Sequence, residues 1–99
     1  MIKRIVMMEL RKGREALFLD IFDEVKNQIR SQRGCMSLEL LRSMNEEKTM
    51  LWTISSWDSE VDLEAYRTSD LFKKTWSDVK PLFSEKALAW TLHPIETVE

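Results

Sequence analysis

The chain has 99 residues, of which 43% are hydrophobic and 32% are charged, and its formal net charge is −2. This length and this balance predict one small globular domain over residues 1–99 and exclude a disordered chain. No basic run follows the pattern of a phosphate-binding surface, and no apolar stretch approaches the roughly 20 residues of a membrane helix. We therefore expect neither nucleic acid nor a membrane as a partner.

Cysteine usage and the N-terminus bear on location and on metals. Cys35 is the only cysteine, so it cannot form an internal disulfide, and the first ten residues lack the cleavage site of a signal peptide. We therefore expect a cytoplasmic protein. One histidine and one cysteine cannot build a zinc site, and two glycines do not make a phosphate loop, so we expect no metal and no cofactor.

The first half of the chain predicts a strand, a helix and a hairpin. Clustered β-branched and apolar residues predict a strand over Ile2–Leu10, after which a helix runs from Glu15 to about Arg33 and ends before a left-handed Gly34. Strands at Cys35–Arg42 and Lys48–Trp57, joined by a polar turn at residues 43–47, predict an antiparallel hairpin. The helix carries an apolar stripe at spacings of three and four, formed by Leu17, Phe18, Ile21, Phe22, Val25 and Ile29. Alternation along the second strand places Met36, Leu38 and Leu40 on one face.

The second half of the chain predicts a helix that breaks at residues 68–70. Ser59 is the expected N-cap of the first segment, with Asp58 as a competing cap. Ser69 or Asp70 caps the second segment, and Pro81 limits it because the residue before a proline resists helical geometry. A last strand then runs from Ala87 to about His93.

The order βαββαβ predicts an α+β, ferredoxin-like fold, with a four-stranded antiparallel sheet and two helices on one face, the second of them broken. Both faces of this sheet carry apolar residues, whereas an open antiparallel sheet normally leaves one face polar. Several hundred Å² of bare apolar surface, at ~25 cal/mol per Å², would cost many kcal/mol. We therefore expect a homodimer formed through the sheet face.

Four segments, in this order, resemble the antibiotic biosynthesis monooxygenase domain: residues 34–41, 56–60 and 66–72, and the pair Ala89-Trp90. The resemblance extends from Ile2 to about Leu92 and rests on order and spacing rather than on one motif. It implies the dimeric α+β barrel, in which two ferredoxin-like subunits pack sheet against sheet. It also implies cofactor-independent oxygenation of polyketide or quinol-like aromatics in some members, haem degradation in others, and no established activity in many.

The haem-degrading branch of that family resembles this chain closely around residues 66–76. At the matching positions that branch has a tryptophan, a histidine and an asparagine, where this chain has Tyr66, Trp76 and Met8. The histidine is the iron ligand of that branch, and Trp76 cannot ligate iron. The resemblance therefore argues against haem degradation, and His93 on the last strand does not occupy the matching position.

Tyr66 and Trp76 have two interpretations. They are either helix residues packed on the sheet or part of a cavity lining, where a buried phenol or indole needs a polar partner. In a cofactor-free oxygenase the substrate gives an electron to O₂, and the protein supplies a base, oxyanion donors and a dry pocket. Tyr66 would then be the oxyanion donor and Trp76 a wall. The predicted substrate-binding set is Met8, Phe22, Trp52, Phe72 and Trp76, and the predicted catalytic set is Tyr66, Trp76 and His93.

Other residues keep alternatives open. Trp52 and Trp90 are core or dimer-interface residues, or one of them lines the pocket. His93 is a solvated edge residue or a general base, and Glu39 is an ion-paired rim residue or a base with a raised pKa. The function predicted by resemblance is a cofactor-independent monooxygenase that acts on a small aromatic or quinol-like substrate. The alternatives are a non-enzymatic protein that binds a small hydrophobic ligand and, less favoured, a haem-handling protein.

Overall fold

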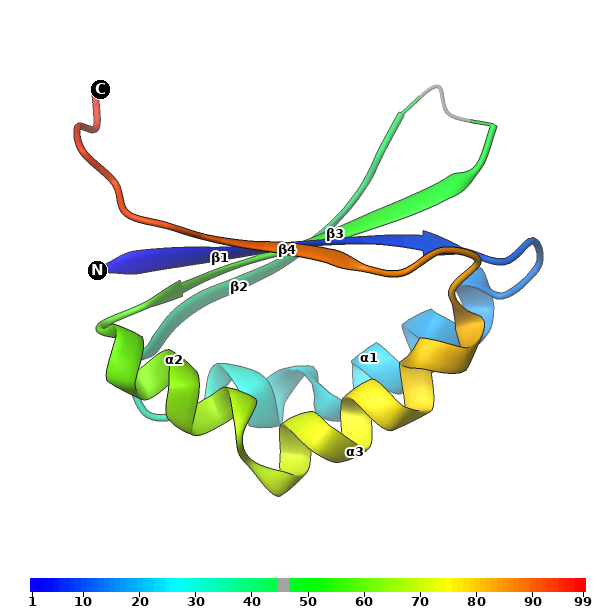
Figure 1. The fold of residues 1–99 in the computed structure, drawn as a ribbon, viewed down its shortest axis with the longest axis horizontal. Helices are drawn as coiled ribbons and strands as arrows, with labels where there is room; N and C mark the ends of the chain where they lie inside the picture. The colour runs from blue at the N-terminus through cyan, green and yellow to red at the C-terminus, as the bar shows by residue number, and fades with distance from the viewer. Residues whose placement is uncertain (45–46) are drawn as a thin grey trace.

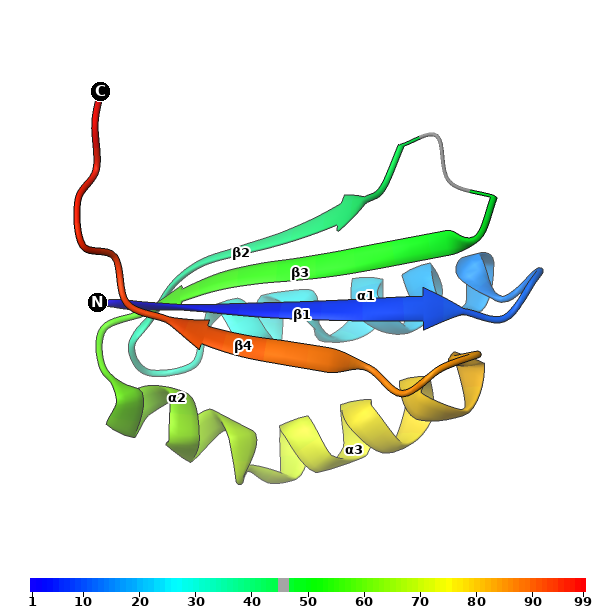
Figure 2. The same cartoon turned by 45° about the horizontal axis from the view of Figure 1, so that its top comes forward.

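In the computed structural model, which describes residues 1–44 and 47–99, four strands form one antiparallel sheet and the helices cover one of its faces (Figures 1 and 2). The strand order is β2-β3-β1-β4, so β1 and β3 are central. The predicted ferredoxin-like fold is therefore confirmed. The elements are β1 (Ile2–Leu10), α1 (Glu15–Arg30), β2 (Cys35–Arg42), β3 (Thr49–Trp57), α2 (Glu60–Arg67), α3 (Asp70–Val79), the short 3₁₀ helix η1 (Lys80–Leu82) and β4 (Leu88–Leu92).

Several predicted boundaries differ from the structure by a few residues. The first helix ends at Arg30 rather than near Arg33, and the hydroxyl of Ser31 donates a hydrogen bond to the carbonyl of Asn27 at that end. Gly34 is left-handed, with φ of +81°, but it lies in the connection to β2 rather than directly after the helix. Strand β3 begins at Thr49 rather than at Lys48, and β4 runs from Leu88 to Leu92 rather than from Ala87 to about His93. The predicted turn at residues 43–47 includes residues 45–46, which lie outside the described residues.

A bulge near the start of β2 changes one predicted orientation. Cys35 pairs with Trp57 and Ser37 with Ser56, so Met36 is an extra residue in the ladder. An inserted residue interrupts the alternation of side chains, and Met36 is 47% exposed instead of being covered with Leu38 and Leu40. The prediction that these three share one face was wrong at Met36.

The break between α2 and α3 is built by two hydroxyl side chains. Ser69 accepts a hydrogen bond from the backbone N–H of Phe72 and donates one to the carbonyl of Tyr66, while Thr68 donates to the carbonyl of Glu64. These bonds satisfy backbone groups that a continuous helix would have paired internally. Ser59 caps α2 by accepting from the N–H of Asp62. Both predicted caps, Ser59 and Ser69, are therefore confirmed.

The buried core is divided into two clusters at opposite ends of the sheet. One contains Met8, Leu10, Phe18, Leu51, Val79 and Phe83. The other contains Ile2, Cys35, Trp57 and Leu63. Strand β1 contributes to both clusters, with Ile2 at its start and with Met8 and Leu10 at its end. The two clusters therefore lie at the two ends of the layer between the helices and the sheet. None of the helices in the described part of the chain is long and apolar enough to cross a membrane.

Candidate functional site

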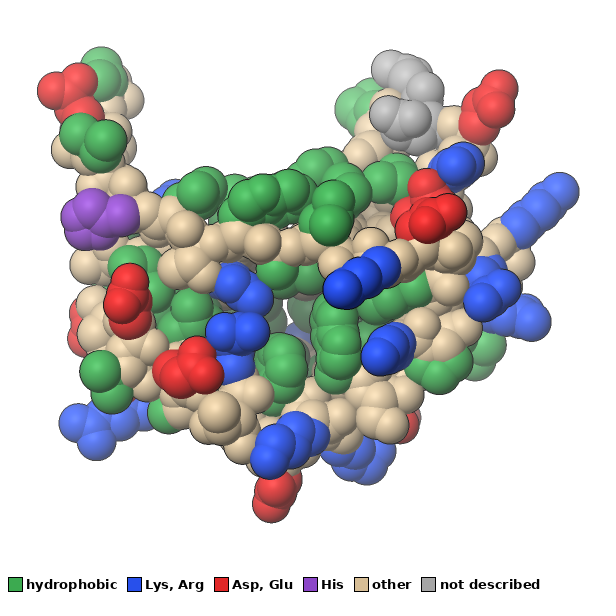
Figure 3. Space-filling view, viewed as in Figure 1, with side chains coloured by type: hydrophobic (Ala, Val, Ile, Leu, Met, Phe, Trp, Pro, Cys, Tyr) green, Lys and Arg blue, Asp and Glu red, His purple; other side chains and the backbone are tan. Residues whose placement is uncertain are grey.

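A cavity of about 280 Å³ lies between the helices and the sheet, and residues of both core clusters contribute to its wall. Its lining is mostly apolar. All four strands and all three α-helices contribute residues to it, and one further residue, Ala87, lies just before β4. Figure 3 shows a hollow between the two layers, with basic side chains at its rim. A mostly apolar cavity with a few convergent polar groups is the usual form of a small-molecule site.

Small side chains on the sheet side and the break between α2 and α3 explain why this space is not filled. Four of the residues that line the cavity from the sheet side have short side chains: Thr53, Ser55, Ala87 and Ala89. Figure 1 shows that α2 runs away from the sheet and α3 runs back toward it, so that the break is the point farthest from the strands. Short side chains beneath an arched helix leave a gap that a straight, well-packed helix would close.

A continuous row of aromatic rings runs along α2 and α3. Tyr66 stacks on Trp57 with ring centroids 5.2 Å apart and meets the edge of Phe72 at 5.3 Å. Trp76 stacks on Phe72 at 5.9 Å and meets Phe83 edge-on at 5.5 Å. Three of these rings, those of Tyr66, Phe72 and Trp76, line the cavity. Each contact has the geometry of a favourable aromatic pair, so the rings stabilise one another along this wall of the cavity.

Tyr66 supplies a proton donor to this wall. Burial raises the pKa of its phenol to about 12, and the neighbouring Cys35 adds to the increase. The phenol therefore stays protonated at neutral pH and can donate but not act as a base. Its hydroxyl forms no hydrogen bond with any residue that the structure describes, whereas the buried indole of Trp57 donates to Ser55 Oγ at 2.9 Å.

Thr75, on α3, is a second polar group at the cavity. Its Oγ1 is buried and has no hydrogen-bond partner among the described residues, and the residue lines the cavity. A buried hydroxyl without a partner is uncommon and costs about 1–3 kcal/mol. A ligand oxygen could provide the missing partner.

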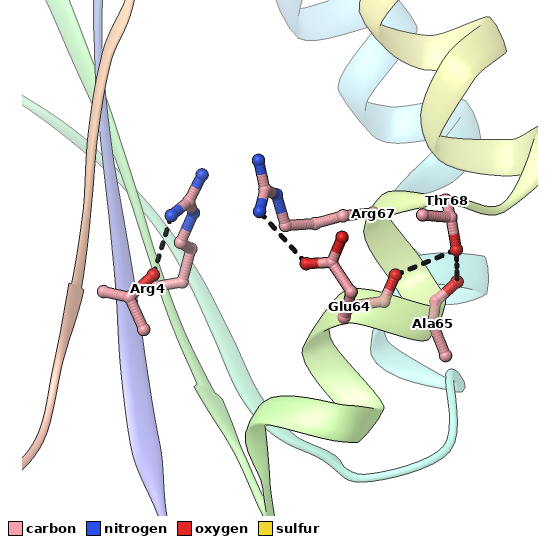
Figure 4. A network of polar contacts seen from close by, with 6 residues as sticks. Arg4, Glu64, Ala65, Arg67 and Thr68 are labelled. Atoms are coloured by element: carbon pink, nitrogen blue, oxygen red, sulfur yellow. Dashed lines mark hydrogen bonds and ion pairs between the residues drawn. The ribbon is translucent and has the colours of Figure 1, made fainter.

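Two arginines give the cavity its charge. Arg4 reaches in from β1 and Arg67 from the end of α2, and their guanidinium groups point toward one another (Figure 4). Arg4 donates to Thr91 Oγ1 at 2.7 Å, and Arg67 pairs with Glu64 at 3.2 Å. Burial lowers the pKa of Arg4, the positive charge of Arg67 lowers it further, and Glu64 opposes both effects.

Five of the predicted site residues line the cavity, and two of them lie elsewhere. Tyr66, Met8, Phe22, Phe72 and Trp76 line the cavity together, as a substrate-binding set would require. Trp52 and His93 are not part of this lining.

Trp52 and His93 lie elsewhere for different reasons. Trp52 pairs with Met7 and Leu41 on the face of the sheet opposite the helices, and its indole donates to Ser43 Oγ at 2.7 Å. His93 follows the end of β4 and is exposed. The structure thus separates both residues from the cavity.

The other open residues also lie outside the cavity. Glu39 is exposed and pairs with Ile54 on the outer face of the sheet, while Arg42 forms its ion pair with Glu15. Trp90 is 42% exposed on the outer face. Cys35 is a buried free thiol whose pKa is raised by desolvation.

Sequence reasoning missed Arg4, Arg67 and Thr75. A signal for Arg4 was present, because alternation along β1 puts it on the same face as Val6 and Met8, and a charge facing inward from a central strand is unusual. The other two gave no signal, since Arg67 and Thr75 sit in helices whose exposed faces carry many polar residues.

The described residues do not support ligation by histidine. No cluster of three or more His, Cys, Asp or Glu within residues 1–44 and 47–99 is placed to hold a metal ion. The described cavity lining contains no histidine, and Trp76 packs between Phe72 and Phe83.

Comparison with known proteins gives the chain's relatives. Residues 1–76 match the family model described as antibiotic biosynthesis monooxygenase. Among solved structures, a candidate antibiotic biosynthesis monooxygenase from Caulobacter crescentus superposes with a TM-score of 0.88 at 20% identity, covering 96% of this chain and 90% of that one. One from Nitrosomonas europaea gives a TM-score of 0.87 at 14% identity, covering 97% and 100%. At these identities the structural likeness shows a shared fold alone. No curated protein matches the sequence of this chain.

Proposed function

The chain belongs to the antibiotic biosynthesis monooxygenase family, and we propose that it is a monooxygenase that oxidises a small aromatic or quinol-like substrate with O₂ and without a cofactor. The observation that carries this proposal is the cavity of about 280 Å³, with its aromatic wall and the unpartnered phenol of Tyr66. This volume lies near the lower end for small-molecule sites, which suits a substrate of two or three fused rings.

The proposed reaction uses the substrate as its only source of electrons. An activated ring methylene loses a proton to give an enolate or phenolate, which transfers one electron to O₂; the two radicals then combine to form a carbon–peroxide bond. Cleavage of the O–O bond, with loss of the second methylene hydrogen, leaves a ketone and hydroxide. The proton released first converts that hydroxide to water. The substrate thus loses four electrons, one oxygen atom enters the product, and the other leaves as water.

The protein's part is to hold the ring, exclude water and donate a hydrogen bond. Phe72 and Trp76 would flank the ring. The phenol of Tyr66, kept protonated by its raised pKa, would donate to the oxygen on which negative charge develops. Removing a single donor of this kind typically reduces turnover by about 10²–10³-fold.

Oxygen uptake tests the proposal. The purified protein, freed of metals with a chelator, is mixed with a panel of anthrones and quinols in an oxygen-electrode cell. We expect uptake above the uncatalysed rate with at least one compound, and a large loss of that rate in Tyr66→Phe. Uptake that depends on added metal, or none across the panel, would overturn the proposal.

One observation favours a second candidate function, a binding protein for a small hydrophobic molecule. The described cavity lining contains neither a carboxylate nor an imidazole that could remove the first proton. A protein that binds the panel compounds tightly without turning them over would have this second function.

We also propose that the protein is a homodimer that packs sheet against sheet. Figure 3 shows an apolar band along the sheet surface opposite the helices. In Figure 1 the C-terminal tail, the end of β2 and the start of β3 all project beyond this surface, as arms around a second copy would. The face carries Ile5, Met7, Leu41, Trp52, Ile54, Leu88, Trp90 and Leu92.

Mass in solution tests the homodimer. Trp90→Glu, on the exposed part of this face, should give a monomer. Val61→Glu changes an apolar residue that is 77% exposed on α2 and should leave the dimer intact. A wild-type protein that is monomeric at micromolar concentration would contradict the proposal.

A cytoplasmic location is also proposed, from the single free thiol of Cys35.

A further inference from the structure

We propose that Arg4 and Arg67 form an anion subsite at the mouth of the cavity, and that the natural ligand is an apolar ring molecule bearing one anionic oxygen group, a carboxylate or a phenolate. The inference rests on the proposed function only in taking the same cavity as the substrate site. It specifies the class of substrate, and it can be tested by binding alone.

Two positive charges lie close together at the cavity. Arg4 is half-buried on a central strand, and its one hydrogen bond to a described residue goes to the neutral hydroxyl of Thr91. No ion pair joins it to a carboxylate within residues 1–44 and 47–99. Arg67 brings a second positive charge toward it (Figure 4). Buried charges are normally paired, and the only carboxylate that acts on these two guanidiniums among the described residues is that of Glu64. The pair of arginines therefore carries one positive charge more than its surroundings balance.

The two arginines lie at the mouth of the cavity. Arg67 and Leu63 line both the cavity and an adjoining surface depression, which Thr91 also borders. Thr91 is the residue that holds the guanidinium of Arg4. Both guanidinium groups therefore lie where the cavity reaches the surface. A ligand can place its charged end there, partly hydrated, while its ring lies against Phe72 and Trp76 deeper inside.

The cavity lining, among the described residues, contains no acidic side chain that would compete with a ligand anion. Among the described residues that form the wall, the only charged side chains are Arg4 and Arg67. Two carboxylates, those of Glu60 and Glu64, line the adjoining depression. Glu64 pairs with Arg67, and its side chain is 63% exposed and can turn toward solvent. A ligand anion can therefore replace it. Two guanidiniums would also favour ionisation of an acidic substrate hydroxyl, so that the absence of a carboxylate base from the lining would not prevent the first step of the reaction.

Calorimetric titration with two matched probes tests the subsite. Naphthoate carries a carboxylate on two fused rings, and naphthamide has the same shape without the charge. We expect the wild-type protein to bind naphthoate at least about tenfold more tightly, since each charge-assisted hydrogen bond contributes roughly a factor of ten. This preference should shrink as salt is added. Naphtholate at high pH, compared with neutral naphthol, tests the phenolate as the anionic group.

Variants separate the subsite from general effects. Arg67→Gln, at an exposed helix position, should remove most of the naphthoate preference and leave naphthamide binding unchanged; Arg4→Gln should do the same. Glu64→Gln should strengthen naphthoate binding, because it frees Arg67. Arg11→Gln removes the same charge from a position outside the cavity lining and should change nothing.

Three results would overturn the inference. Equal affinities for naphthoate and naphthamide, a preference that survives both Arg4→Gln and Arg67→Gln, or no binding of either probe at millimolar concentration would each do so. If Arg4→Gln fails to fold, the comparison of Arg67→Gln with the wild type, together with its salt dependence, still decides. A carboxylate preference without oxygen uptake would support the subsite and remove the oxygenase proposal; oxygen uptake without a preference would do the opposite.

Discussion

Replacing Gly34 by alanine tests how closely α2 is held against the rest of the fold. Gly34 lies in the connection between α1 and β2, with φ of +81°, and its carbonyl accepts a hydrogen bond from the N–H of Asp58 at 2.8 Å. A Cβ atom added at Gly34 would lie 2.5 Å from the Cβ of Asp62. Because Asp62 belongs to the first turn of α2, this close approach fixes the helix that carries Tyr66 and Arg67.

The expected cost has two parts. A non-glycine residue in the left-handed region costs about 1 kcal/mol. The overlap involves the Cβ of Asp62, which a side-chain rotation cannot move, so the backbone of α2 must shift at a further cost of about 1–3 kcal/mol. We therefore expect Gly34→Ala to lower the free energy of unfolding by about 3 kcal/mol, equivalent to a melting temperature lower by about 15 °C.

Gly13 provides the matched control. It is also left-handed, with φ of +78°, but no atom lies within 4 Å of an added Cβ. Gly13→Ala should therefore cost about 1 kcal/mol, the backbone part alone. Both variants are compared by guanidinium denaturation followed by circular dichroism at one protein concentration, since a dimer's stability depends on concentration. Equal losses in the two variants would show that α2 does not approach Gly34 as described.

Three further predictions concern the cavity wall. Ser69→Ala removes the hydroxyl that joins the carbonyl of Tyr66 to the N–H of Phe72. Denaturation should show that the free energy of unfolding falls by about 1–2 kcal/mol, and ligand affinity should fall as well. An unchanged denaturation midpoint would contradict the role of Ser69 as a cap. Thr75→Val removes a buried hydroxyl that has no partner among the described residues and should raise the free energy of unfolding by about 1 kcal/mol, whereas a clear loss of stability would mean that the hydroxyl is paired. Burial raises the pKa of Tyr66 to about 12, whereas a tyrosine in the unfolded chain ionises near pH 10. As the pH rises, the unfolded chain therefore loses this proton before the folded protein does. The free energy of unfolding should fall by about 3 kcal/mol between about pH 10 and about pH 12. Since Tyr66 is the only tyrosine, ultraviolet titration follows it directly, and Tyr66→Phe should lack this fall; a midpoint near pH 10 would contradict the burial.

The fold was predictable because local patterns agreed with one another. Alternation marked the strands, three-to-four spacing marked the first helix, and Ser59 and Ser69 marked the starts of α2 and α3, where their hydroxyls accept the expected backbone bonds. Met36 escaped prediction because a bulge inserts a residue into one strand only, and alternation alone does not reveal such an insertion.

The site was less predictable because a strand pattern gives relative and not absolute orientation. Alternation shows that Trp52 and Ile54 share a face, but it does not tell which face the helices cover. The helices cover the face with Thr53 and Ser55, which puts Trp52 on the opposite side. The meeting of Arg4 and Arg67 joins residues 63 positions apart in the chain, and only the packed structure brings them together.

Labelled oxygen gives the most direct test of the proposed monooxygenase. The chelator-treated protein is incubated with the best substrate of the anthrone and quinol panel under heavy-isotope O₂ in ordinary water, and the product is analysed by mass spectrometry. We expect one labelled oxygen atom per product molecule, one O₂ consumed for each product formed, and loss of this labelling above background in Tyr66→Phe. Product oxygen that comes from water, or labelling that requires added metal, would contradict the proposed function.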